Sequence, residues 1–194
     1  ELTYVAKFAE SIESTYQEHY FLQFAHPFDN VVQYLDEVVE VLAAQISAAA
    51  TGRVERGEAA WPEVPRELYD ARLAPERRLR AILKFASQLL PDADGHCMVI
   101  ALLPFECSDA DAYSQLVLGA AAIDRAEEPW FERIRLVMYD DRSRRIATKT
   151  LAGNSVRHVL VCQVDFSTPA LTDALARDAA DPALPESERM ACLL

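Results

Sequence analysis

The feature that most constrains the fold is an unbroken apolar run in the middle of the chain, Cys97-Met-Val-Ile-Ala-Leu-Leu103, bounded by Gly95 and Pro104. A strand that is covered on both faces has this composition, and such strands belong mostly to parallel sheets. Two later runs, 134–139 and 159–164, are also strand-like. The sequence therefore predicts three neighbouring strands.

Helices are expected between and after these strands. Ser108 predicts the start of a helix after the first strand. The segment 140–155 has room only for a short helix around 144–151, and Pro169 suits the first turn of a last helix. This order predicts an α/β fold, built on a small three-stranded parallel sheet with the pattern strand-helix-strand-crossover-strand-helix.

The first 91 residues are expected to form a helical region that packs on the sheet. Apolar side chains over 2–24 predict one helix, which His26-Pro27 interrupts. The α/β core is then expected over 92–182. Residues 183–194 resemble the start of a further helix, so we expect the natural chain to continue beyond Leu194.

A strong amphipathic helix is expected after the His-Pro break. Asp29 or Asn30 can cap it, and Gly52 is a plausible stop just after Ala50. Its apolar residues recur at three- and four-residue steps: Val31, Leu35, Val38, Leu42 and Ile46, widened by Val32 and Val39.

The next helix is expected to begin near Pro75. The polar stretch over 51–74, with Trp61 between prolines, predicts a loop or a partly ordered arm.

The net charge indicates which partners the protein can bind, and the cysteines indicate the cellular compartment. A net charge of −12 disfavours a nucleic-acid partner, because phosphate binding needs a basic footprint. No apolar run approaches the roughly 20 residues of a membrane helix, so no membrane partner is expected. Four cysteines without a CxxC pair suit a reducing compartment and predict a cytoplasmic protein.

Two basic groups are interpreted as the solvated faces of helices or turns, because no aromatic residues interleave with them. Their members are Arg77, Arg78, Arg80 and Lys84 in one group and Arg142, Arg144, Arg145 and Lys149 in the other.

The sequence motifs of common enzymes are missing from the chain. It has neither GxxxxGK[ST] nor GxGxxG to cradle a phosphate, and neither GxSxG nor HExxH. The four histidines are scattered and are interpreted as structural. No cofactor is therefore expected.

Acidic residues follow each predicted strand, at the edge where open α/β sheets bind ligands. Glu106, Asp140, Asp141 and Asp165 are the candidate metal ligands, since Mg²⁺ prefers carboxylate oxygens. Such a site would serve metal-dependent phosphotransfer or hydrolysis. The alternative is that Glu106 and Asp165 serve turns and caps, while Asp140 and Asp141 begin a polar loop. A Lys or Ser/Thr placed to handle phosphate is missing, which counts against the metal site.

Aromatic residues near chain breaks are the candidates for protein interaction, because aromatic side chains often anchor interfaces. These are Trp61, Phe24, Phe28, Trp130 and Phe131. The alternative is that they seal the helical half against the sheet, and the polar, proline-flanked setting of Trp61 makes it the exception.

Four segments, taken in order, carry a resemblance to a known group of proteins. They are Phe24-Ala-His-Pro-Phe-Asp29 with Tyr34-Leu35, Leu102-Leu-Pro-Phe-Glu-Cys107, Ile134-Arg-Leu-Val-Met-Tyr-Asp-Asp141 and Val164-Asp-Phe-Ser167. The chain resembles uncharacterised bacterial proteins in which such an α/β domain precedes tetratricopeptide-like repeats. Some of these are associated with type VI secretion effector loci. The resemblance carries no functional residues across.

These observations favour a non-catalytic protein-binding domain, an adaptor or chaperone-like module of a larger bacterial protein. The alternative is a metal-dependent or degenerate nucleotide-binding enzyme domain that uses the strand-end carboxylates. An adaptor should have an apolar or aromatic groove at its surface, whereas the enzyme should gather at least three of the four carboxylates in one cleft.

Overall fold

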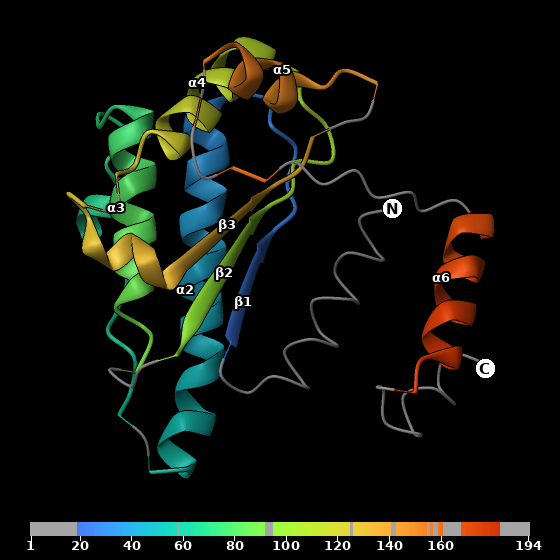
Figure 1. Cartoon of the computed structure of the whole chain (residues 1–194). Helices are drawn as coiled ribbons and strands as arrows, with labels where there is room; N and C mark the ends of the chain where they lie inside the picture. Colours follow the sequence, from blue (N-terminus) through green and yellow to red (C-terminus); the bar gives the residue numbers. More distant parts are fainter. Residues whose placement is uncertain are drawn as a thin grey trace. The chain divides into compact units, whose positions relative to one another are not determined.

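The computed structural model describes residues 19–57, 59–91, 95–124, 126–140, 143–154, 156, 159–160 and 168–182. These residues belong to two compact units, which divide between Val159 and Leu160. The first unit contains the sheet and most of the helices. The second contains helix α6 (Thr168–Ala180), which has Pro169 in its first turn as predicted (Figure 1).

The first unit is built on a three-stranded sheet, as predicted. Strands β1 (His19–Phe24), β2 (Cys97–Leu102) and β3 (Ile134–Met138) are all parallel and lie in the order β1-β2-β3. Since β1 comes from the first 91 residues, the predicted helical region and the predicted α/β core share one sheet.

The prediction of helix over 2–24 is wrong for residues 19–24, and the rest of that segment lies outside the described residues. Tyr20 and Phe24 are four residues apart, a spacing that puts side chains on one side of a helix and also on one side of a strand. The spacing therefore did not separate the two possibilities.

The predicted strand over 159–164 is not seen in Val159 or Leu160, which are described outside any strand. Its remaining residues lie outside the described part of the chain.

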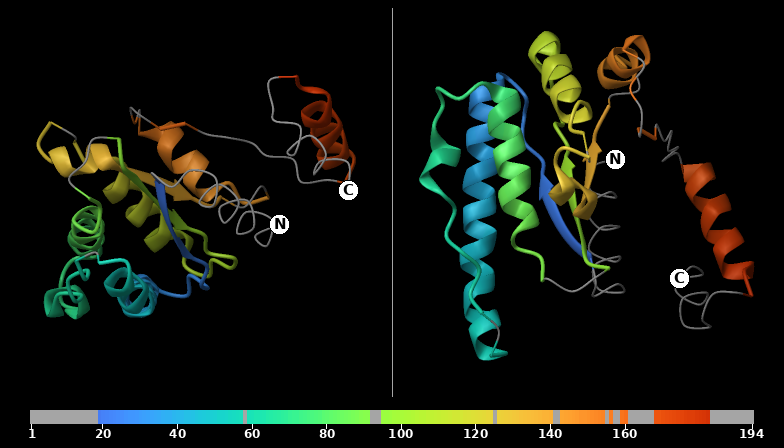
Figure 2. Two further views of the ribbon diagram at one scale, coloured as in Figure 1. Left: turned by 90° about the horizontal axis from the view of Figure 1, so that it is seen from below. Right: turned by 60° about the vertical axis from the view of Figure 1, so that its left-hand side comes forward.

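Three helices, α2 (Val31–Glu55), α3 (Pro75–Ser87) and α4 (Ala110–Ala121), pack on one face of this sheet (Figures 1 and 2). When parallel strands follow one another in sequential order, right-handed connections must all cross the same face. α3 and α4 approach closely: a Cβ added to Gly119 would lie 2.6 Å from the Cγ of Glu76.

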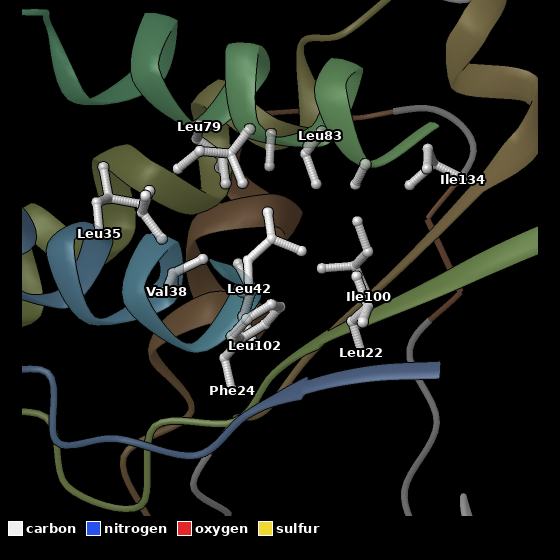
Figure 3. Close-up of a cluster of buried hydrophobic side chains, with 14 of the residues drawn as sticks. Leu22, Phe24, Leu35, Val38, Leu42, Leu79, Leu83, Ile100, Leu102 and Ile134 are labelled. Atoms are coloured by element: carbon white, nitrogen blue, oxygen red, sulfur yellow. The ribbon is translucent and has the colours of Figure 1, made fainter. Parts of the chain in front are cut away.

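The core lies between this face and the helices (Figure 3). Alternate residues of each strand point into it, as the pleat requires. Its buried members include Leu22, Phe24, Met98, Ile100, Leu102 and Ile134 from the sheet, and Leu35, Val38, Leu42, Leu79, Leu83, Leu116 and Val117 from the helices. The predicted apolar stripe of α2 is therefore largely confirmed.

The opposite face of the sheet is less buried than the face that packs on the helices. On β2, Ala101 is buried and Val99 half-buried, but on β3 both Arg135 and Val137 are exposed. The central strand β2 therefore fits its expectation of cover on both faces.

Helix ends follow local chemistry, with two corrections. Asn30 caps α2 as predicted, its Oδ1 accepting the Gln33 N–H at 2.8 Å. The helix passes Gly52 and ends at Glu55, because Gly57 (φ +72°) supplies the left-handed residue that closes such an end. The cap of α4 is Asp109 rather than Ser108.

The stretch between α2 and α3 is not a loose arm. The short 3₁₀ helix η1 (Arg66–Tyr69) buries Leu68 within it, and Trp61 also packs on the core. Two further elements complete the unit: η2 (Pro129–Arg133) before β3, and α5 (Ile146–Gly153), the short helix expected after β3.

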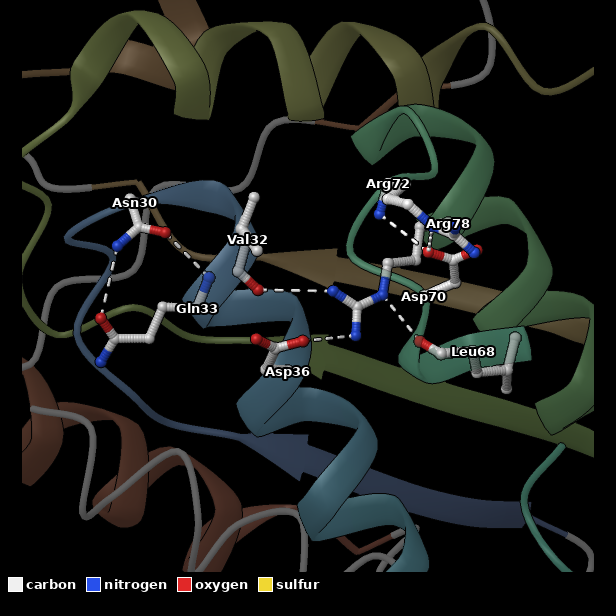
Figure 4. A network of polar contacts seen from close by, with 8 residues as sticks. All are labelled: Asn30, Val32, Gln33, Asp36, Leu68, Asp70, Arg72 and Arg78. Atoms are coloured by element: carbon white, nitrogen blue, oxygen red, sulfur yellow. Dashed lines mark hydrogen bonds and ion pairs between the residues drawn. The ribbon is translucent and has the colours of Figure 1, made fainter. Parts of the chain in front are cut away.

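Arg78 holds η1 against the two long helices (Figure 4). Its side chain is only 1% exposed, so its interpretation as part of a solvated face is wrong. The guanidinium donates to the Leu68 carbonyl at 2.7 Å, to the Val32 carbonyl at 3.5 Å and to the Asp36 carboxylate at 2.6 Å. These bonds satisfy a buried charge that would otherwise destabilise the fold.

We expect Arg78→Met to lower the free energy of unfolding by about 2–3 kcal/mol. The variant keeps the apolar stem but leaves the Leu68 carbonyl without its donor, while the half-exposed Asp36 regains water. Urea unfolding followed by circular dichroism measures the change. Arg77→Met, at the exposed neighbouring position, is the matched control and should change stability by less than about 0.5 kcal/mol. Equal stability of the two variants would contradict this role.

Candidate functional site

The loops at the carboxyl ends of β1 and β2 are joined by backbone hydrogen bonds. The Phe28 N–H donates to the Glu106 carbonyl at 2.7 Å, and the Ser108 N–H donates to the Phe28 carbonyl at 2.9 Å. The Ser108 hydroxyl donates to Asp29 at 2.9 Å. This rim of the sheet, where ligands bind in many α/β proteins, is therefore well ordered by its own contacts.

A pocket of about 190 Å³ lies at this carboxyl rim. Its lining residues are Pro104, Phe105, Glu106, Cys107, Tyr113, Tyr139, Asp140, Arg144 and Ile146. Two of the four candidate metal ligands, Glu106 and Asp140, thus line one pocket. The other two, Asp141 and Asp165, lie outside the described residues. Within the described part of the chain, no three His, Cys, Asp or Glu side chains are placed to hold a metal ion together.

Asp140 is engaged in capping α5. Its Oδ1 accepts the Ala147 N–H at 3.1 Å, and its Oδ2 accepts the N–H and the hydroxyl of Thr148 at 2.8 and 2.6 Å. The residue before the helix, Arg145, has a left-handed backbone (φ +53°) and gives no side-chain cap. Asp140 therefore satisfies amides that the local sequence leaves open, a capping role that the sequence did not predict for this residue.

The thiol in this pocket is not activated. Burial raises the pKa of Cys107, and nearby Arg144 opposes that shift only in part. The Arg144 guanidinium donates to the Cys107 carbonyl. Burial also raises the pKa of Tyr113, whose hydroxyl donates to the Tyr139 carbonyl at 2.6 Å. A neutral thiol and a neutral phenol are poor nucleophiles, so this pocket can bind a ligand more readily than it can react with one.

A larger hollow of about 280 Å³ lies toward the amino ends of β1 and β2, beside the C-terminal half of α2. We call it the Trp61 pocket. Its lining residues are Tyr20, Phe21, Leu22, Leu42, Gln45, Ile46, Trp61, Leu89 and Met98. Aliphatic and aromatic side chains dominate this wall, as in pockets that take an apolar group.

Three contacts fix the orientation of the half-buried Trp61. Its indole N–H donates to the Leu89 carbonyl at 2.8 Å. The Tyr20 ring meets it edge-on, with centroids 6.1 Å apart, and the Arg53 guanidinium lies 4.7 Å from the ring centroid. Trp61 is thus held in place before any partner binds, which reduces the entropy lost on binding.

The other aromatic candidates differ in their availability. Phe24 and Phe28 are 1% and 0% exposed and belong to the core. This corrects their interpretation as interaction residues, because neither offers its side chain at the surface. Trp130 and Phe131 are half-buried on η2, with ring centroids 5.6 Å apart. The Trp130 N–H donates to Glu128. Of the five candidates, Trp61 alone lines one of the two pockets described above.

Sequence reasoning missed Gln45 as part of this pocket. It predicted a helix at Tyr20, whereas strand β1 brings this aromatic residue beside Trp61. Gln45 is a polar residue between Leu42 and Ile46 on the apolar side of α2. A polar residue at that point in the helical period was the available signal.

Comparison with known proteins adds no relative. No protein-family model, no curated protein sequence and no solved structure matches this chain at a significant level. Among the helices that the structure describes, none combines the length and the apolar character required to traverse a lipid bilayer.

We expect Asp140→Asn to lower the free energy of unfolding by about 1–2 kcal/mol, because the amide cannot accept all three hydrogen bonds that reach the carboxylate. Glu106→Gln is the matched control in the same pocket. Its side chain is exposed, and it should be neutral within about 0.5 kcal/mol. Chemical denaturation of both variants measures the difference, and a neutral Asp140→Asn would argue that the carboxylate has another role.

Proposed function

We propose that this chain is a non-catalytic protein-binding domain, an adaptor or chaperone-like module, and that the Trp61 pocket receives a side chain of its partner. The pocket carries the proposal: it is apolar, has aromatic walls and includes a Trp whose ring is held by hydrogen bonding and stacking. Interfaces draw most of their affinity from a few side chains that fill such pockets, and tryptophan is prominent among them.

The carboxyl rim also supports a binding function over a catalytic one. Among the described candidate carboxylates, Asp140 caps a helix, and burial raises the pKa of the Cys107 thiol. A catalytic site requires a base or nucleophile that is free to react and a partner that orients it. Asp140 is occupied by groups at the start of α5, and the raised pKa of Cys107 disfavours its thiolate.

The charge of the chain indicates the kind of partner. With a net charge of −12, the domain attracts a basic protein over long range and repels an acidic one. Association should therefore weaken as salt screens the attraction, while the apolar contact at Trp61 remains.

The cellular setting is proposed from the sequence. The thiols of Cys97 and Cys107 are both free, which suits the reducing cytoplasm. The resemblance noted above suggests that the domain belongs to a larger bacterial protein. It also suggests that this protein takes part in effector loading in type VI secretion.

A displayed library of random peptides tests the proposal. We expect selection on the chain to enrich basic peptides with a shared apolar or aromatic anchor. Trp61→Ala should weaken their binding at least tenfold in fluorescence anisotropy, because it removes one wall of the pocket.

Phe105→Ala is the control for this test, since Phe105 is an aromatic residue 55% exposed at the other rim. It should leave the affinity unchanged, and circular dichroism should verify that both variants fold. Failure to enrich any peptide family, or equal binding to Trp61→Ala, would refute the proposal.

A ligand site at the carboxyl rim is the second candidate, because Glu106 and Asp140 line one pocket there. We expect millimolar Mg²⁺ to leave the melting temperature of the chain unchanged, since Asp140 is occupied by amides. A stabilisation by Mg²⁺ that Asp140→Asn abolishes would favour the metal-dependent alternative.

A further inference from the structure

The Trp61 pocket contains a polar side-chain atom that has no hydrogen-bond partner within the described part of the protein. The Gln45 Oε1 is buried and accepts no hydrogen bond. Buried acceptors in folded proteins are nearly always paired, so an unpaired one in a pocket wall is available to a donor from outside the chain.

Neither the apolar neighbours of Gln45 on α2 nor the indole of Trp61 supplies that donor. Gln45 lies on α2 between the buried Leu42 and Ile46, which are both apolar. The indole N–H of Trp61, in the same wall, already donates to the Leu89 carbonyl. The terminal torsion of a glutamine is broad, so Oε1 can reorient toward a guest at little torsional cost.

The remaining lining residues indicate which kind of group the pocket would bind. Tyr20 and Trp61 form an edge-to-face pair, and aromatic rings favour further rings in offset or edge-on contact. Leu22, Leu89 and Met98 add apolar surface, and thioether sulfur also contacts rings favourably. The wall therefore combines aromatic surroundings with one unpaired acceptor.

We propose that the Trp61 pocket is specific for an aromatic ring that carries a hydrogen-bond donor, as in a tyrosine side chain of the partner, and that this donor binds Gln45 Oε1. This inference rests on the proposed function and adds its specificity. A ring without the donor leaves the acceptor unpaired, which is how a polar group in an apolar site rejects a close analogue.

Two small probes test the specificity on the intact chain. p-Cresol presents a hydroxyl donor, and p-xylene has nearly the same shape, with a methyl group in place of the hydroxyl and no donor. Binding is followed through the Trp61 indole N–H and backbone signals in ¹H–¹⁵N spectra. We expect p-cresol to bind about tenfold more tightly than p-xylene, and to shift the signals of Tyr20, Gln45 and Trp61.

Gln45→Leu removes the acceptor and should bring the two affinities within about twofold of each other, chiefly by weakening p-cresol. Gln115→Leu, at an exposed position of α4, should retain the tenfold preference. Because the probe pair is also compared on the unaltered chain, the test does not depend on the stability of either variant. The selected peptides offer a second comparison, in which replacing an anchor tyrosine by phenylalanine should cost a similar factor.

Equal binding of the two probes would overturn the donor specificity while leaving an aromatic pocket, and thus the proposed function, intact. Absence of binding by either probe would overturn the inference as a whole. The Trp61-dependent peptide selection then decides separately whether the domain binds proteins through this surface.

Discussion

The sequential order of three parallel strands is the constraint on which the rest of this structure depends. Each connection between neighbouring parallel strands must return the chain to the end of the sheet where the strands begin. Because both connections are right-handed, both cross the same face of the sheet. α2, α3 and α4 therefore form one layer and share one core with the sheet. The loops gather at the two ends of the sheet, and both pockets described above lie there.

Polar contacts position the chain at each rim where packing alone would not. At the amino rim, the end of the sheet where the strands begin, Trp61 on the α2–α3 connection donates to the carbonyl of Leu89. Later on the same connection, the carbonyl of Leu68 accepts from Arg78, which also binds Asp36 near the start of α2. At the other rim Asp140 closes the start of α5. The first arrangement leaves an aromatic pocket open, whereas the second occupies the most promising carboxylate. This difference favours binding at the amino rim.

Much of the first unit could be predicted from local patterns, because β2, β3, α2, α3 and α4 each have a clear period or a clear boundary residue. β1 could not, since its four-residue spacing suits a helix and a strand equally and its pairing partner lies far along the chain.

The site was harder to predict than the fold. Arg78 looked like surface charge because its acceptors, Leu68 and Val32, are backbone carbonyls that no side-chain pattern reveals. Trp61 could be selected for its unusual polar setting. The acceptor of Gln45 gains significance only when tertiary packing encloses it.

The pairing of β1 with β2 also has a consequence for synthesis. Residues 25–96 separate the two strands, so β1 leaves the ribosome before its partner exists. At about 5–20 residues per second, its Tyr-Phe-Leu-Gln-Phe sequence waits several seconds with unpaired backbone and exposed aromatic side chains. Such an edge invites pairing with other nascent chains. The long connection between the two strands thus lengthens the interval in which the nascent chain can mispair.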